Sequence, residues 1–70
     1  MKPLTPRQLA ICHMIADGWQ NKEIVREEDS SLSAVKRQIE AIMAKTGTTN
    51  RAELAVWYVR QQVGAQLEQR

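Results

Sequence analysis

Cysteine and histidine are scarce in this sequence, with Cys12 and His13 the single examples of each. One cysteine cannot close a disulfide within the chain. One residue of each type also excludes Cys-rich zinc sites and most other transition-metal geometries. Phenylalanine is absent, and the aromatic residues are Trp19, Trp57 and Tyr58. The hydrophobic core is therefore expected to be aliphatic.

Long apolar runs are also absent. No stretch approaches the ~20 apolar residues of a membrane-spanning helix, and no apolar segment follows Lys2, so we expect neither a membrane span nor a signal peptide. A cytoplasmic protein is therefore expected. With 70 residues, the chain has room for one domain, residues 1–70. A domain of this size buries only about 60% of its unfolded surface, which favours a module that works through its surface over an enzyme with an enclosed pocket.

Residues suited to catalysis are likewise few. Cys12 and His13 are neighbours, so on a helix they point apart and do not readily form a nucleophile–base pair. The sequence contains no glycine-rich phosphate loop and no other catalytic motif. The acids at 27–29 lack the glycine and the ligand spacing of a calcium loop. We therefore expect no enzyme activity, no cofactor and no metal site.

The signals that are present are those of helices. The sequence predicts four, at about 6–17, 21–28, 32–46 and 51–64, with a frayed tail at 65–70. Residues with the spacing of caps mark two of the helix starts, and glycines mark two of the ends; these residues are Thr5 with Gln8, Asn50 with Glu53, Gly18 and Gly47. No strand alternation is visible, so the predicted class is all-α.

The second and third helices, joined by a turn of three to four residues, are typical of a helix-turn-helix. A plain four-helix bundle without a ligand has the same spacing, so spacing alone does not separate the two interpretations. Residues 31–51 carry a net charge of +3, and residues 17–30 carry a net charge of −3. Such a pair of stretches indicates an oriented electrostatic surface, although solvated helix faces also carry charge runs.

Periodicity at ~100° per residue divides the helix 32–46 into two faces. The apolar Val35, Ile39 and Ile42 point together and are predicted to be buried. The opposite face consists of Ser33, Lys36, Arg37, Glu40 and Ala44. Arg and Lys can reach guanine edges in the major groove of DNA, whereas a carboxylate is repelled by phosphates unless it accepts from a cytosine amine.

The last helix carries two apolar stripes, and a helix on a small core can bury only one of them. One stripe consists of Ala52, Ala55, Val56, Val59 and Val63, and the other of Leu54, Trp57, Tyr58 and Gln61. We expect the second stripe to be exposed as a homodimer interface; the alternative is that the tail folds back over it. A two-fold dimer would present two recognition helices to two DNA half-sites.

Short motifs along the chain match a known family. They are Leu4-Thr5-Pro6-Arg7, Ile15-Ala16-Asp17-Gly18, Asn21-Lys22-Glu23-Ile24, Val35-Lys36, Ile42, Lys45, Gly47 and Asn50-Arg51-Ala52-Glu53. In this order and spacing, the sequence resembles the LuxR/FixJ-type (NarL-like) helix-turn-helix domain over residues 4 to about 63. The resemblance implies a four-helix domain that binds double-stranded DNA, with the third helix in the major groove and a dimer contact through the fourth.

The resemblance also implies roles for individual residues. Lys22 and Lys45 correspond to lysines that contact phosphates, and Arg51 corresponds to an arginine that is mainly structural. Val35, Lys36 and Arg37, and one turn later Glu40, correspond to residues that contact bases and backbone. The predicted DNA-binding set is Lys22, Ser33, Lys36, Arg37, Glu40, Lys45 and Arg51.

The turn departs from the family pattern. Where Leu, Gly and Ile or Val are usual, the sequence has Glu28, Asp29 and Ser30, and Ala34 and Gln38 replace a usual Thr and His. These changes remove apolar and phosphate contacts and add acids beside the DNA-facing helix. A distorted turn and weakened or repurposed DNA binding are therefore expected.

Two functions are compatible with these features. The first is a homodimeric transcription regulator that binds a pseudo-palindromic DNA site. The alternative is a protein-interaction module that binds another LuxR-type regulator through its fourth helix and inhibits it, with weak or no DNA binding. Members of the family normally carry a receiver or ligand-binding domain before this module, so we expect a stand-alone member or an excised domain.

Overall fold

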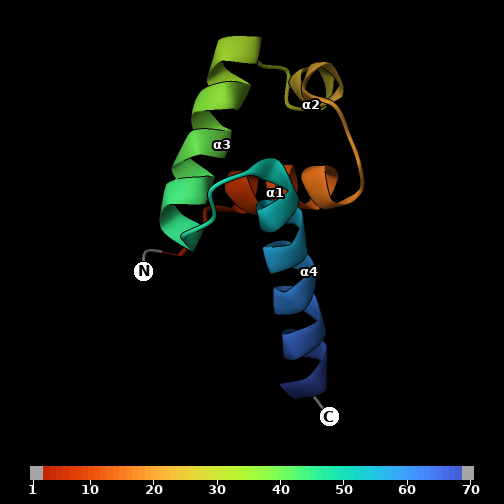
Figure 1. Ribbon diagram of the computed structural model, residues 1–70. Coiled ribbons are helices and arrows are strands. Elements are labelled where there is room, and N and C mark those ends of the chain that lie inside the picture. The colour runs from red at the N-terminus through yellow and green to blue at the C-terminus, as the bar shows by residue number, and fades with distance from the viewer. Residues whose placement is uncertain (1–2, 69–70) are drawn as a thin grey trace.

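Four α-helices make up the part of the chain that the computed structural model describes, residues 3–68 (Figure 1). They are α1 (Pro6–Ala16), α2 (Asn21–Glu27), α3 (Leu32–Thr46) and α4 (Arg51–Glu68). The predicted all-α class is confirmed, and no strand occurs within residues 3–68. The tail predicted to fray from residue 65 is helical as far as Glu68. The end of that predicted tail, residues 69–70, lies outside the described residues.

Caps fix the helix ends largely as the sequence predicts. The backbone N–H of Gln8 donates to Thr5 Oγ1, and the backbone N–H of Thr5 donates to Gln8 Oε1, both at 3.1 Å, which completes the capping box of α1. Before α4, the backbone N–H of Glu53 donates to Asn50 Oδ1 at 2.9 Å. The Glu53 carboxylate, however, accepts from Thr49 rather than from Asn50. Each cap pairs amide groups that the first helical turn leaves without partners.

The core is aliphatic, as the scarcity of aromatic residues predicts. All four helices contribute to it, and its buried side chains are Ile11, Cys12, Met14, Ile15, Ile24, Val35, Ile39, Ile42 and Leu54. Trp19, Trp57 and Tyr58 pack at its edge and stay partly exposed. Because α3 contributes three of the buried side chains, all on one side of the helix, the direction in which its other side points is fixed.

The helices are arranged so that α1 packs against both α3 and α4, while α2 packs against α3 (Figure 1). The C-terminal part of α4 extends beyond the other three helices, and the molecule has principal extents of 39 × 21 × 20 Å. Within the described part of the chain, nothing covers the outer side of this projecting helix. The outward side of α3 and the outer side of the projecting part of α4 are therefore among the surfaces that the fold leaves exposed.

Candidate nucleic-acid interface

The helix-turn-helix is built from α2, residues 28–31 and α3. In the turn, the backbone N–H of Ser30 donates to the carbonyl oxygen of Val25 at 3.1 Å, which closes the end of α2. The next helix begins after Ser31, whose Oγ accepts from the backbone N–H of Ala34 at 3.1 Å. The sequence predicts a distorted turn, yet hydrogen bonds close both the end of α2 and the start of α3.

Asp29 adopts the conformation that a glycine would adopt in this turn. Its φ is +49°, and among the described residues no other non-glycine residue has a positive φ. A left-handed conformation is unfavourable by roughly 1–2 kcal/mol for a residue with a Cβ, although Asp tolerates it better than most. Asp29 thus carries some backbone strain, and it places an exposed carboxylate just before α3.

The predicted division of α3 into two faces is confirmed. The exposed fractions of Val35, Ile39 and Ile42 are 1%, 7% and 0%. The side chains predicted to point outward are exposed, and they are Ser33, Lys36, Arg37, Glu40 and Ala44. Both cations are therefore exposed on the side of α3 away from the core, which holds the helix in a fixed orientation.

Lys22 and Arg51 lie near the start of α2. Lys22 is exposed, whereas Arg51, the first residue of α4, is half-buried. Arg51 Nη1 donates to Asn21 Oδ1 at 2.6 Å, and Nη2 donates to the carbonyl oxygen of Trp19. These bonds tie the beginning of α4 to the beginning of α2, in agreement with the structural role that the resemblance implies for Arg51.

Lys45 lies in the last turn of α3, at the end away from the helix-turn-helix turn. Its side chain is half-buried, and Nζ donates to Gln8 Oε1 at 2.8 Å and to the carbonyl oxygen of Pro3 at 3.4 Å. Sequence reasoning assigned Gln8 only a capping role and missed this second one. The contact joins residues 37 positions apart, so no local sequence pattern signals it.

Acidic side chains border this surface at the turn. Glu28 pairs with Arg7 across the domain, with Nε and Oε1 3.2 Å apart. Among the side chains that the structure describes, this is the one ion pair. Glu27 and Asp29 are exposed beside it, and Glu40 is exposed on α3 itself. The cations of α3 therefore share their surface with carboxylates, which would repel a phosphate group.

The predicted orientation of α4 is wrong. Leu54 is fully buried in the core, and Trp57 and Tyr58 are half-buried against it, although Gln61 is exposed. The stripe that faces outward is the other one, and its half-exposed members are Val56, Val59 and Val63. The physical reason is size: Leu, Trp and Tyr bury more apolar surface than Val and Ala, so the core is built on the stripe that carries them.

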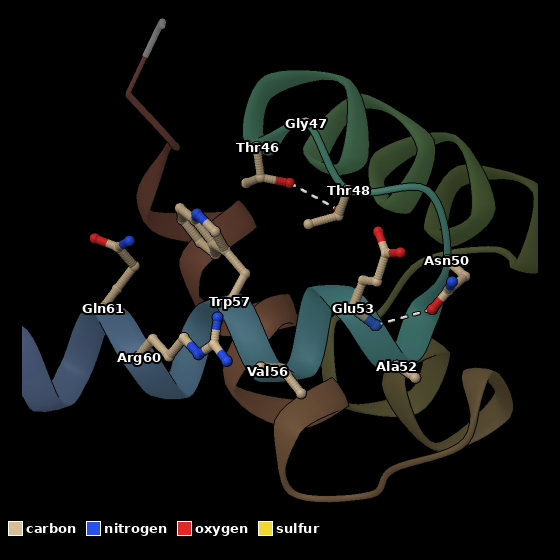
Figure 2. A pocket seen from close by; sticks show the side chains of 10 residues that line it. All are labelled: Thr46, Gly47, Thr48, Asn50, Ala52, Glu53, Val56, Trp57, Arg60 and Gln61. Carbon is tan, nitrogen blue, oxygen red and sulfur yellow. Dashed lines mark hydrogen bonds between the residues drawn. The ribbon is translucent and has the colours of Figure 1, made fainter.

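A hollow of about 730 Å³ lies between the end of α3 and the start of α4, with Val56 and Trp57 in its lining (Figure 2). Some of its polar groups bond to one another: the hydroxyls of Thr46 and Thr48 are 2.9 Å apart, and the backbone N–H of Glu53 donates to Asn50 Oδ1. Its lining includes no cysteine and no histidine.

The one thiol of the chain lies in the core and not at the surface. Cys12 is fully buried, and burial raises the pKa of its thiol to about 11, so the thiol stays protonated and packs as a small hydrophobe. Among the side chains that the structure describes, up to residue 64, no group of His, Cys, Asp and Glu is placed to hold a metal ion. No described helix has the length and apolar composition needed to cross a membrane.

Comparison with known proteins agrees with the geometry of α2 and α3. Residues 2–58 match the family of bacterial regulatory proteins called the luxR family. The chain belongs to this family. The match includes α1, α2, α3 and the first part of α4, so the complete helix-turn-helix lies inside it. This match confirms the family resemblance that the motifs indicated, and the family is one of DNA-binding transcription regulators.

Several curated relatives of this luxR-family chain are named as regulators. The monoamine regulon transcriptional regulator of Klebsiella aerogenes is 45% identical over 51 residues, which cover 73% of this chain and 22% of that protein. The nitrate/nitrite response regulator protein NarL of Escherichia coli is 37% identical over 60 residues, 86% of this chain and 28% of that protein. The probable transcriptional regulator ycf29 of Porphyra purpurea is 35% identical over 57 residues, 81% and 27% of the two chains. The chain thus spans about a quarter of their length, and no solved structure matches it.

Proposed function

We propose that this luxR-family chain regulates transcription by binding double-stranded DNA with α3 in the major groove. The observation that carries the proposal is the division of α3: Lys36 and Arg37 are exposed on one side, while Val35 is buried on the other. A helix that is anchored by its apolar face presents the opposite face in a fixed orientation. Arg and Lys on such a face can bond to guanine O6 and N7.

Two groups of residues have different roles in this proposal. Ser33 and Glu40 join the two cations of α3 at the base edges, where contacts supply sequence specificity. Lys22 of α2, Lys45 in the last turn of α3 and Arg51 at the start of α4 contact phosphates, which supply salt-dependent affinity. Lys45 and Arg51 both donate to uncharged oxygen atoms. Their hydrogen bonds therefore hold these side chains in place and leave their positive charge available to DNA.

A homodimer through α4 is the second part of the proposal. It is supported by the valine face, which we define as Val56, Val59 and Val63, each about half exposed on the projecting helix. An exposed apolar stripe of this kind is typical of a protein interface. A two-fold axis at the valine face would present two copies of α3 to half-sites one helical turn of DNA apart. A role at DNA also implies a cytoplasmic location, which stays a prediction.

A second candidate function is favoured by the acids near α3. Glu40 is exposed in the middle of the proposed recognition face, and Glu27 and Asp29 are exposed at the turn. These carboxylates oppose phosphate binding. A chain with weak DNA affinity and an intact valine face would pair with another luxR-family regulator and inhibit it by forming a heterodimer.

Selection from a random pool of duplex oligonucleotides with the purified chain tests both functions. Selections at about 50 and about 200 mM salt separate sequence-specific from purely electrostatic binding. Enrichment of a symmetric motif is the expected result. Enrichment of a single half-site would support DNA binding and contradict the dimer. Absence of any motif at both salt concentrations would contradict the proposed function and leave the heterodimer as the better account.

A further inference from the structure

The Gln8 side chain connects the start of α1 to α3 at two points. Gln8 is only 6% exposed. Its Oε1 accepts from the backbone N–H of Thr5 at 3.1 Å and from Lys45 Nζ at 2.8 Å, while its Nε2 donates to Gln38 Oε1 at 3.2 Å. Gln38 and Lys45 are seven residues apart, about two helical turns, and so they lie on the same flank of α3. One buried amide therefore fixes the flank of α3 next to α1.

The charge of Lys45 is not neutralised by these contacts. An ammonium group has three N–H donors, and Lys45 gives one to the Gln8 amide and one to the carbonyl oxygen of Pro3. Both acceptors are uncharged, and the third donor is left for another oxygen. Lys45 is half-buried in the last turn of α3, and these two bonds hold its ammonium group against Gln8 and Pro3.

We propose that Gln8 is a positioning residue for DNA binding, because its neutral amide fixes the Lys45 ammonium beside α3 without neutralising it. This inference rests on the proposed function. A carboxylate at position 8 would hold Lys45 equally well but would form an ion pair with it. Lys45 would then no longer neutralise a DNA phosphate, and the counterion of that phosphate would not be released on binding. The salt dependence of DNA affinity would therefore fall by one phosphate contact per chain. The neutrality of Gln8 thus sets how strongly salt affects DNA affinity.

The test compares Gln8→Glu with Gln8→Met, which has a similar length and no acceptor. DNA affinity is measured over a range of salt concentrations, and unfolding by urea is followed in parallel. For Gln8→Glu we expect cooperative unfolding and a salt slope smaller by about 0.9 per bound chain. Between about 50 and about 200 mM salt, this difference changes the affinity ratio of wild type to variant by about 3.5-fold. For Gln8→Met we expect weaker binding with the wild-type slope, because Lys45 keeps its charge and loses its position.

Ala10→Glu is the matched control, because it adds the same charge to the exposed side of α1 and is expected to keep the wild-type slope. A wild-type slope for Gln8→Glu, or equal slopes for both Gln8 variants, would overturn the proposal. If Gln8→Glu loses cooperative unfolding, Gln8→Met carries the test: weaker binding with the wild-type slope supports the inference, and wild-type affinity overturns it. A wild-type chain whose DNA binding does not depend on salt would contradict the proposed function itself.

Discussion

Truncation of Leu54 to alanine tests the orientation of α4. Leu54 has an exposed fraction of 0% and packs in the core. Its replacement by Ala removes three carbon atoms, at about 0.8 kcal/mol each, and leaves a cavity, so the expected loss of unfolding free energy is about 3 kcal/mol. A 70-residue domain has a total of roughly 4–10 kcal/mol. The melting temperature should therefore fall by about 12–24 °C.

Urea unfolding followed by circular dichroism measures this loss, with Val59→Ala as the matched control on the same helix. Val59 is 50% exposed, so its truncation should cost less than about 1 kcal/mol in dilute protein. If the valine face forms a dimer, the effect of Val59→Ala should grow with protein concentration, because only the dimer is stabilised by mass action. A loss below about 1 kcal/mol for Leu54→Ala, or a larger loss for Val59→Ala in dilute protein, would refute the observed orientation.

Two further predictions concern the turn and the thiol. Asp29→Gly should raise the unfolding free energy by up to about 1 kcal/mol, because relief of the left-handed strain outweighs the extra chain entropy of glycine; a lower urea midpoint would contradict this. The pKa of Cys12 is raised from 9.0 to about 11 in the folded chain, so the stability linked to its protonated thiol is present below pH 9 and is lost as the pH rises toward 11. Comparison of urea midpoints with those of Cys12→Ala over this range should isolate the effect, and identical pH profiles would rule it out.

Much of the fold follows from local signals in the sequence. The capping box of Thr5 and Gln8 depends on residues three positions apart, and the buried face of α3 depends on one helical period. Such features need no knowledge of the rest of the molecule. For the same reason, the exposure of Lys36 and Arg37 was predictable as soon as the helix was recognised.

The orientation of α4 and the long-range polar contacts were not predicted correctly, because both depend on tertiary packing. In α4 both stripes are apolar, so periodicity alone does not decide whether Leu54 or Val59 faces the core. The decision depends on the space beside α1, which only the folded chain defines. Distant polar contacts are also invisible to local patterns, as with Arg7 and Glu28. The network around Gln8 was missed for this reason, although it joins the predicted cation Lys45 to α1.

The proposed recognition face is tested by its effect on specificity. The measurement is the ratio of affinities for a selected duplex and a scrambled duplex at one fixed salt concentration, in the wild type and in Lys36→Ala/Arg37→Ala. Because each good base contact is worth roughly 1–3 kcal/mol, we expect the double variant to lower this ratio by at least about 30-fold. Arg26→Ala removes an exposed cation from α2 and should leave the ratio unchanged. An unchanged ratio in the double variant would show that the exposed face of α3 does not read DNA.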